Sequence, residues 1–146
     1  MRNKLRAAAA LSGSDWRVLA GAWSLLLAAG LGLRLLPLRR VQRLLGAAGG
    51  RPPAAGDELG AVSRLARLVG VAARNHLLPL HCLERALVLQ VLLRRRGIAT
   101  ELRIGVRREG GALDAHAWLE RAGVPLGEPS STRERYATLA AREALI

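Results

Sequence analysis

The apolar pattern of the chain changes its period at Gly97, and this change limits the folds that the sequence can adopt. Before Gly97, apolar residues recur at helical spacing, most clearly over residues 83–96. After it, Leu102, Ile104 and Val106 alternate with charged or small residues, as in a half-buried strand. Because helical patterns come first and strand patterns follow, the sequence predicts an α+β domain: N-terminal helices, then a small antiparallel sheet.

Helical patterns in the first two thirds of the chain define its expected organisation. Pro37 suits the first position of a helix, and Asp57 suits an N-cap. Residues 46–56 contain two prolines and several glycines, so they are expected to be a linker. We therefore expect an N-terminal helical region and linker over 1–56, packed on or docking to a core domain over 57–146. The expected helices cover residues 16–36, 38–45, 58–74 and 82–96.

The first expected helix is unusually apolar. Residues 18–33 carry no charge and lie between Arg17 and Arg34. Sixteen helical residues reach only about 24 Å, less than the roughly 30 Å hydrocarbon core of a bilayer. The segment also lacks a clear signal-peptide cleavage site. We expect a buried or docking helix, with weak contact to a membrane surface as the alternative.

The strands expected after Gly97 form a small meander. Turns at 109–111 and 122–123 separate three strands, and the sheet should pack on the helix that contains Cys82. Pro125 cannot donate a ladder hydrogen bond, so the third strand, 124–128, is expected to be short or at an edge. Residues 133–146 are expected to form a short terminal helix.

Composition excludes several kinds of site. One cysteine in 146 residues excludes an internal disulfide and suits a reducing, cytoplasmic compartment. The three histidines and the cysteine lack zinc-ligand spacing, so we expect no metal and no cofactor. The net charge of +12 should attract acidic peptides, RNA or anionic lipid. A single tyrosine and no phenylalanine argue against specific recognition of nucleic acid.

Cys82 is the first candidate for chemistry. Pro79 disfavours helix at Leu78, so Cys82 is expected in the first turn, or at the cap, of a new helix. Free N–H groups and the positive end of the helix dipole favour a thiolate there. A thiol in this position can act as a nucleophile. A buried, purely structural cysteine is the alternative.

His116 is the candidate base, on the second expected strand. A three-residue loop over 121–123, with glycine at its last position, would place His116 directly opposite Glu128. A two-residue loop would instead place Glu128 opposite Ala117. The three-residue loop is the expected one, and it allows a chain of Cys82, His116 and Glu128. Asp114, two residues along the same strand face, is the rival carboxylate for orienting His116.

Four segments taken together resemble the lasso peptide leader peptidases, which are transglutaminase-like, papain-related cysteine hydrolases. The resemblance extends over about residues 79–136. The segments are 82–87 (CLERAL), 92–98 (LLRRRGI), 102–106 (LRIGV) and 115–120 (AHAWLE).

The resemblance implies roles for these residues and partners for the chain. Cys82 matches the nucleophile and His116 the base, while Glu128 takes the place of an acid that is often Asp after Asn. The implied activity is removal of the leader from a ribosomally synthesised lasso precursor peptide. No recognition segment precedes Cys82, so the chain resembles the stand-alone peptidase half. It should work with a separate leader-binding protein and a lasso cyclase, in the cytoplasm or peripheral to the membrane.

Two other classes of function fit parts of the sequence. A non-catalytic helical scaffold, or a membrane-docked adaptor of a biosynthetic complex, would explain the apolar segment 18–33. A basic RNA-binding module would explain the charge. Acyl transfer of the transglutaminase type uses the same three residues, and the sequence does not separate it from hydrolysis.

Overall fold

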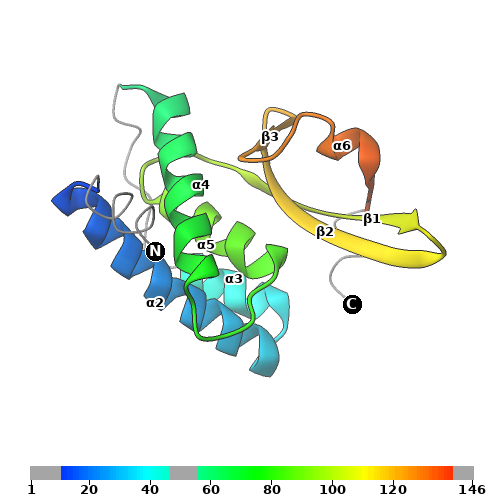
Figure 1. Cartoon of the computed structure of the whole chain (residues 1–146), viewed down its shortest axis with the longest axis horizontal. Coiled ribbons are helices and arrows are strands. Elements are labelled where there is room, and N and C mark those ends of the chain that lie inside the picture. The colour runs from blue at the N-terminus through cyan, green and yellow to red at the C-terminus, as the bar shows by residue number, and fades with distance from the viewer. Residues whose placement is uncertain (1–10, 47–55, 140–146) are drawn as a thin grey trace, which may run out of the picture.

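A computed structural model describes residues 11–46 and 56–139 of the chain, which form an α+β domain (Figure 1). The four described helices before residue 95 gather on one side, and the long hairpin of residues 101–121 extends from the other. The predicted fold class is confirmed. The elements are α2 (Gly13–Leu35), α3 (Leu38–Gly46), α4 (Glu58–Arg74), α5 (Cys82–Arg94), β1 (Glu101–Glu109), β2 (Ala112–Arg121), β3 (Val124–Leu126), α6 (Thr132–Arg135) and β4 (Ala137–Thr138).

The helix starts follow local capping rules. The Asp57 carboxylate accepts from the N–H of Gly60 at 2.9 Å, which confirms Asp57 as the N-cap of α4. Helix α2 begins before the expected Trp16, because Ser12 and Asp15 form a capping box. Cys82 is the first residue of α5, after the N-cap His81, as predicted.

Helices α2, α4 and α5 form the core against one face of the sheet. On α2, Ala22, Leu26 and Ala29 are completely buried, and the same core includes Leu65 of α4 and Val88 of α5. By length and composition, α2 is also the one described helix that is long and apolar enough to cross a membrane. One face of α2 nevertheless packs on α4 and α5, through Ala22, Leu26 and Ala29.

The sheet is antiparallel with strand order β3-β2-β1-β4. The expectation of one helix over 133–146 is wrong for its described part, since α6 ends at Arg135 and β4 follows. Tyr136 has extended backbone angles that end α6 and lead into β4. Gly105 makes the pairing of β4 with β1 possible, because a Cβ there would lie 2.8 Å from the Cβ of Tyr136. Residues 140–146 lie outside the described part.

The β2–β3 hairpin differs from the expected register. The turn contains two residues, Ala122 with φ 49° and Gly123 with φ 77°, so Arg121 pairs with Val124. Positive φ at both positions is the type I′ geometry, which matches the twist of the strands. The predicted three-residue loop is therefore wrong. Strand β3 is also shorter than expected, because it ends at Leu126.

Candidate active site

Cys82 is the N-terminal residue of α5, and its side chain is partly exposed. The first turn of this helix is anchored by Glu84, a buried carboxylate that accepts from the N–H of His81 at 3.0 Å. Because Cys82 is the first residue of α5, its own N–H has no partner within the helix. The helix start therefore presents a thiol and a backbone donor together.

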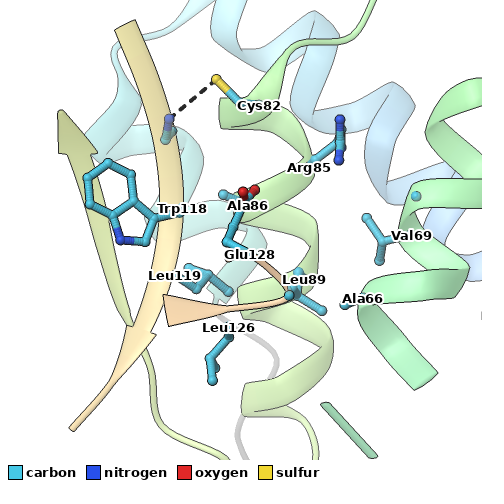
Figure 2. Close-up of a pocket in the computed structure, with 13 residues that line it drawn as sticks. Ala66, Val69, Cys82, Arg85, Ala86, Leu89, Trp118, Leu119, Leu126 and Glu128 are labelled. Atoms are coloured by element: carbon cyan, nitrogen blue, oxygen red, sulfur yellow. Dashed lines mark hydrogen bonds between the residues drawn. The ribbon is translucent and has the colours of Figure 1, made fainter. Parts of the chain in front are cut away.

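The open edge of β2 contacts the thiol. The N–H of Ala117 donates to Sγ of Cys82 at 3.3 Å (Figure 2). Ala117 is two residues before Leu119, so its N–H points to the same edge of β2 as that of Leu119, which pairs with Leu126 of β3. Strand β3 has already ended at this level. Its short length leaves the Ala117 amide free to bind sulfur.

The side chains of His116 and Glu128 are paired, with Nε2 and Oε1 3.2 Å apart. The sequence predicted this contact from the wrong register. In the observed register, a continued β3 would place Glu128 opposite Ala117. Gly127 instead adopts a φ of +68° and turns the chain out of the strand, which brings Glu128 to His116. A Cβ on Gly127 would lie 3.0 Å from that of Ala66, so α4 also limits this position to glycine.

Two aromatic side chains hold the imidazole of His116. Its ring stacks on Trp118 with centroids 5.9 Å apart, and lies 5.3 Å from the ring of Tyr136. Each aromatic group is itself fixed: the Trp118 indole donates to Glu120 at 3.0 Å and the Tyr136 hydroxyl to Asp114 at 2.9 Å. Sequence reasoning missed Tyr136. The available sequence signal was Gly105, a small residue in the alternating pattern of β1 that leaves room for another residue to pack against the strand.

Asp114, the alternative carboxylate for orienting His116, forms hydrogen bonds with other residues. It accepts from Nε of Arg107 at 2.8 Å and from the hydroxyl of Tyr136. The Arg107 hydrogen bond, followed by that of Tyr136, holds the pKa of Asp114 below its usual value. Burial, followed by the same hydrogen bond, raises the pKa of Tyr136. Among the described residues, Glu128 and not Asp114 is the carboxylate paired with His116.

A narrow pocket opens beside the thiol. Cys82, Arg85 and Glu128 contribute its polar lining, and Arg85, like Tyr136, was not predicted as a site residue from the sequence. Arg85 follows Cys82 by three positions on α5, which places both side chains on one helix face. It is exposed and forms no ion pair within residues 11–46 and 56–139. The apolar walls are formed by Ala66, Val69, Ala86, Leu89, Leu119 and Leu126 (Figure 2).

The structure brings the three predicted site residues to one place without joining all of them. The Cys82 thiol contacts Ala117, the direct neighbour of His116, but the described residues show no hydrogen bond between that thiol and the imidazole. The described part also contains no group of three or more His, Cys, Asp or Glu side chains able to hold a metal ion. The arrangement gathers a thiol, an imidazole paired with a carboxylate, and a backbone N–H donor.

The fold and this arrangement define an α+β domain in which a thiol at a helix start lies near a histidine on a strand and a glutamate in the loop that follows the next strand. Residues 23–141 match the family model described as the transglutaminase-like superfamily, and the chain belongs to this superfamily. The superfamily includes cysteine peptidases. No curated protein and no solved structure matches the chain.

Proposed function

We propose that the protein is a cysteine peptidase that removes the leader from a ribosomally synthesised lasso precursor peptide. The observation that carries the proposal is the pocket shared by Cys82 and Glu128, with Glu128 ion-paired to His116. Membership of the superfamily supports cysteine-based catalysis. The resemblance of segments 82–87 and 115–120 to leader peptidases supports the narrower substrate class.

In this mechanism, His116 removes the thiol proton of Cys82 and the thiolate attacks the scissile carbonyl carbon. The Ala117 amide donates to the sulfur and so stabilises its negative charge. The backbone N–H of Cys82 donates to the oxyanion that forms. The C–N bond then breaks as His116 returns the proton to the leaving amine, which is the amino end of the core peptide. Water, deprotonated by His116, hydrolyses the thioester and releases the leader acid.

Glu128 has a positioning role in this scheme. Its Oε1 lies 3.2 Å from Nε2 of His116. In the proposed scheme this pairing keeps a proton on Nε2, leaves Nδ1 as the basic nitrogen and stabilises the imidazolium ion. The thiol–imidazole hydrogen bond is the contact that binding of the substrate must complete. Catalytic hydrogen bonds are often long in a free enzyme and tighten in the substrate complex. Arg85, at the pocket wall, would meet the peptide as it enters.

The proposed partners follow from the same resemblance. The precursor's leader would be held by a small leader-binding protein in trans, and a lasso cyclase would close the freed core peptide. Both steps would take place in the cytoplasm. No cofactor takes part in the proposed reaction.

The test uses the full chain with a precursor peptide and a leader-binding protein encoded beside its gene, with products followed by mass spectrometry. Wild-type protein should release the intact leader and core, and Cys82→Ala should release neither while keeping its far-ultraviolet circular dichroism spectrum. Iodoacetamide should alkylate Cys82 and stop cleavage. Unchanged cleavage by Cys82→Ala would refute the proposal.

Acyl transfer is the second candidate, because the superfamily match fits it equally well. The thioester at Cys82 would then react with an amine instead of water. A small primary amine added to the cleavage reaction separates the two outcomes. Hydrolysis predicts a free leader acid as the main product, and acyl transfer predicts the leader amide.

A further inference from the structure

The corner where α2 passes into α3 exposes leucine and arginine side chains side by side. Leu35 is 80% exposed, and Leu31, one turn earlier on the same face of α2, is 46% exposed. Leu44 of α3 is 66% exposed. We call the exposed residues Leu31, Leu35, Arg39, Arg40, Arg43 and Leu44 the corner surface.

Packing fixes the orientation of this surface. Val41 of α3 is buried, and its methyl groups lie 3.3 and 3.5 Å from the Cβ position of Gly32 on α2. Arg40, Arg43 and Leu44 are exposed on α3, at the spacing of one helix face that flanks the buried Val41. Because Val41 packs against α2, the arginine side chains of α3 face solvent.

Among the described residues, the charged side chains near the α2–α3 corner are all positive. Residues 16–56 contain six arginines and no aspartate or glutamate. Arg94, at the end of α5, lies over the end of α3, with Nη1 3.2 Å from the Cβ position of Gly46. Within the part of the chain that the structure describes, the arginines of the corner surface and Arg94 form no ion pairs. The surface is therefore both cationic and apolar.

We propose that the corner surface docks the protein on an anionic membrane. Arginines would bind lipid phosphates while the exposed leucines enter the boundary between headgroups and acyl chains. A nucleic acid would match the charge but would leave Leu35 and Leu44 in water. Helix α2 does not cross the bilayer in this proposal, since its opposite face, with Leu26 completely buried, stays in the core. The docking is independent of the proposed peptidase activity.

The experiment measures flotation of the full-length protein with vesicles of phosphatidylcholine, with or without phosphatidylglycerol. The protein should float with the anionic vesicles only, and less at high salt. Arg39→Glu with Arg40→Glu should weaken this binding at least about tenfold, because each arginine near an anionic surface contributes roughly fivefold. Leu35→Ser with Leu44→Ser should weaken it as well, without any change in net charge.

The matched control is Arg108→Glu with Arg135→Glu, which changes the net charge equally at exposed positions on the hairpin tip and α6. This variant should bind anionic vesicles within about twofold of wild type. An equal loss in the control, or wild-type binding by the leucine variant, would overturn the proposal. So would retention on a polynucleotide in the absence of vesicle binding. Circular dichroism confirms that each variant is folded.

Discussion

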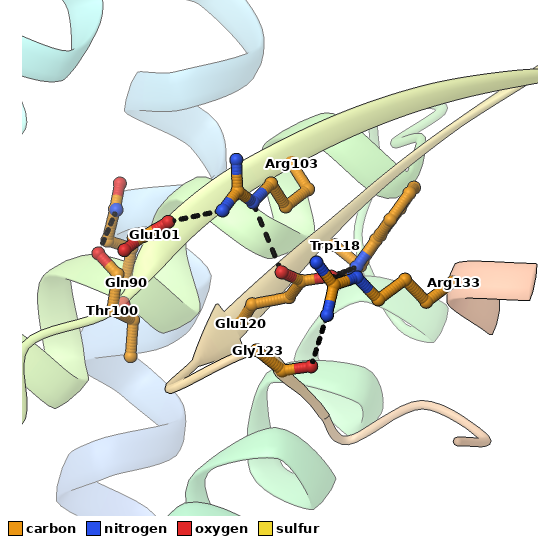
Figure 3. Close-up of polar contacts among 8 residues, drawn as sticks. All are labelled: Gln90, Thr100, Glu101, Arg103, Trp118, Glu120, Gly123 and Arg133. Carbon is orange, nitrogen blue, oxygen red and sulfur yellow. Dashed lines mark hydrogen bonds and ion pairs between the residues drawn. The ribbon is translucent and has the colours of Figure 1, made fainter. Parts of the chain in front are cut away.

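Two carboxylates on or beside β2 are held in opposite ways. Glu120, near the C-terminal end of the strand, is 1% exposed and is bound by Trp118 at 3.0 Å and Arg103 at 3.1 Å, with Arg133 at 3.8 Å (Figure 3). Glu128, in the loop after β3, is partly exposed in a pocket and pairs with His116 in the middle of β2. A buried carboxylate that is hydrogen-bonded at both oxygens stabilises a fold, whereas a partly exposed carboxylate beside a thiol is available for chemistry.

Trp118 connects the two carboxylates. Its indole N–H donates to the buried Glu120, while its ring stacks on the imidazole of His116 at an interplanar angle of 19°. The group around the buried Glu120 thus orients the imidazole that pairs with Glu128. The comparison predicts that substitution of His116 or Glu128 changes activity and that substitution of Glu120 changes stability.

His116→Ala should have the largest effect. Removing the base should lower kcat/KM for leader cleavage by about a thousandfold or more. The His116 side chain is partly exposed, so the free energy of unfolding should change little. Cleavage kinetics and urea denaturation of the same variant measure both quantities. A large loss of stability would place His116 with the structural group around Glu120 and break the comparison.

Glu128→Gln should have the second-largest effect. An amide retains the size of the side chain but does not stabilise an imidazolium ion, so kcat should fall by about a hundredfold. The fall should appear in kcat rather than in KM, because the substrate still binds. Asp114→Asn is the control, since Asp114 is paired with Arg107 and Tyr136. Equal losses of kcat in the two variants would contradict the assignment of Glu128.

Glu120→Ala should act on stability. The change leaves the Trp118 indole N–H and the Arg103 guanidinium without their shared partner, which should cost about 2 kcal/mol in the free energy of unfolding. Glu101→Gln is the matched control, because Glu101 pairs with the same Arg103 on the exposed surface. Its cost should stay below about 0.5 kcal/mol. Similar values for the two variants would remove the distinction between buried and exposed partners.

The smallest effect concerns Asp114, which lies two residues from His116 on β2 but, like Glu120, is hydrogen-bonded to partners of its own. Its folded-state pKa lies below the ordinary 3.8, chiefly because of the hydrogen bond from Arg107. The unfolded state therefore binds the proton first as the pH falls. The stabilisation is complete above the unfolded pKa and is lost as the pH falls through the folded one. Urea midpoints at about pH 5 and pH 3 should differ less in Asp114→Asn than in wild type.

Local sequence rules predicted the elements that depend on near neighbours. The change of period at Gly97 separated helices from strands, and Pro79 with the following apolar pattern placed Cys82 at the start of α5. Asp57 was a recognisable N-cap because capping involves only the next three residues. These features follow from backbone geometry and side-chain spacing within one or two turns.

The hairpin shows where local rules are insufficient. The turn places Ala122 at a positive φ, which costs free energy for a residue with a Cβ. The observed register pairs Leu119 with Leu126, and both contact the core beneath the sheet. A three-residue loop would have moved Leu126 to the opposite face. Burial of leucine by α4 and α5 outweighed the turn preference.

By itself, the sequence determined the order of helices and strands, the position of Cys82 at a helix start and the candidates His116 and Glu128, because period, capping and motif spacing act over short distances. Only the tertiary structure decided which carboxylate meets His116. That choice depends on the bend at Gly127 and on the capture of Asp114 by Arg107 and Tyr136. Both result from contacts between elements far apart in the chain, where packing selects among locally equivalent conformations.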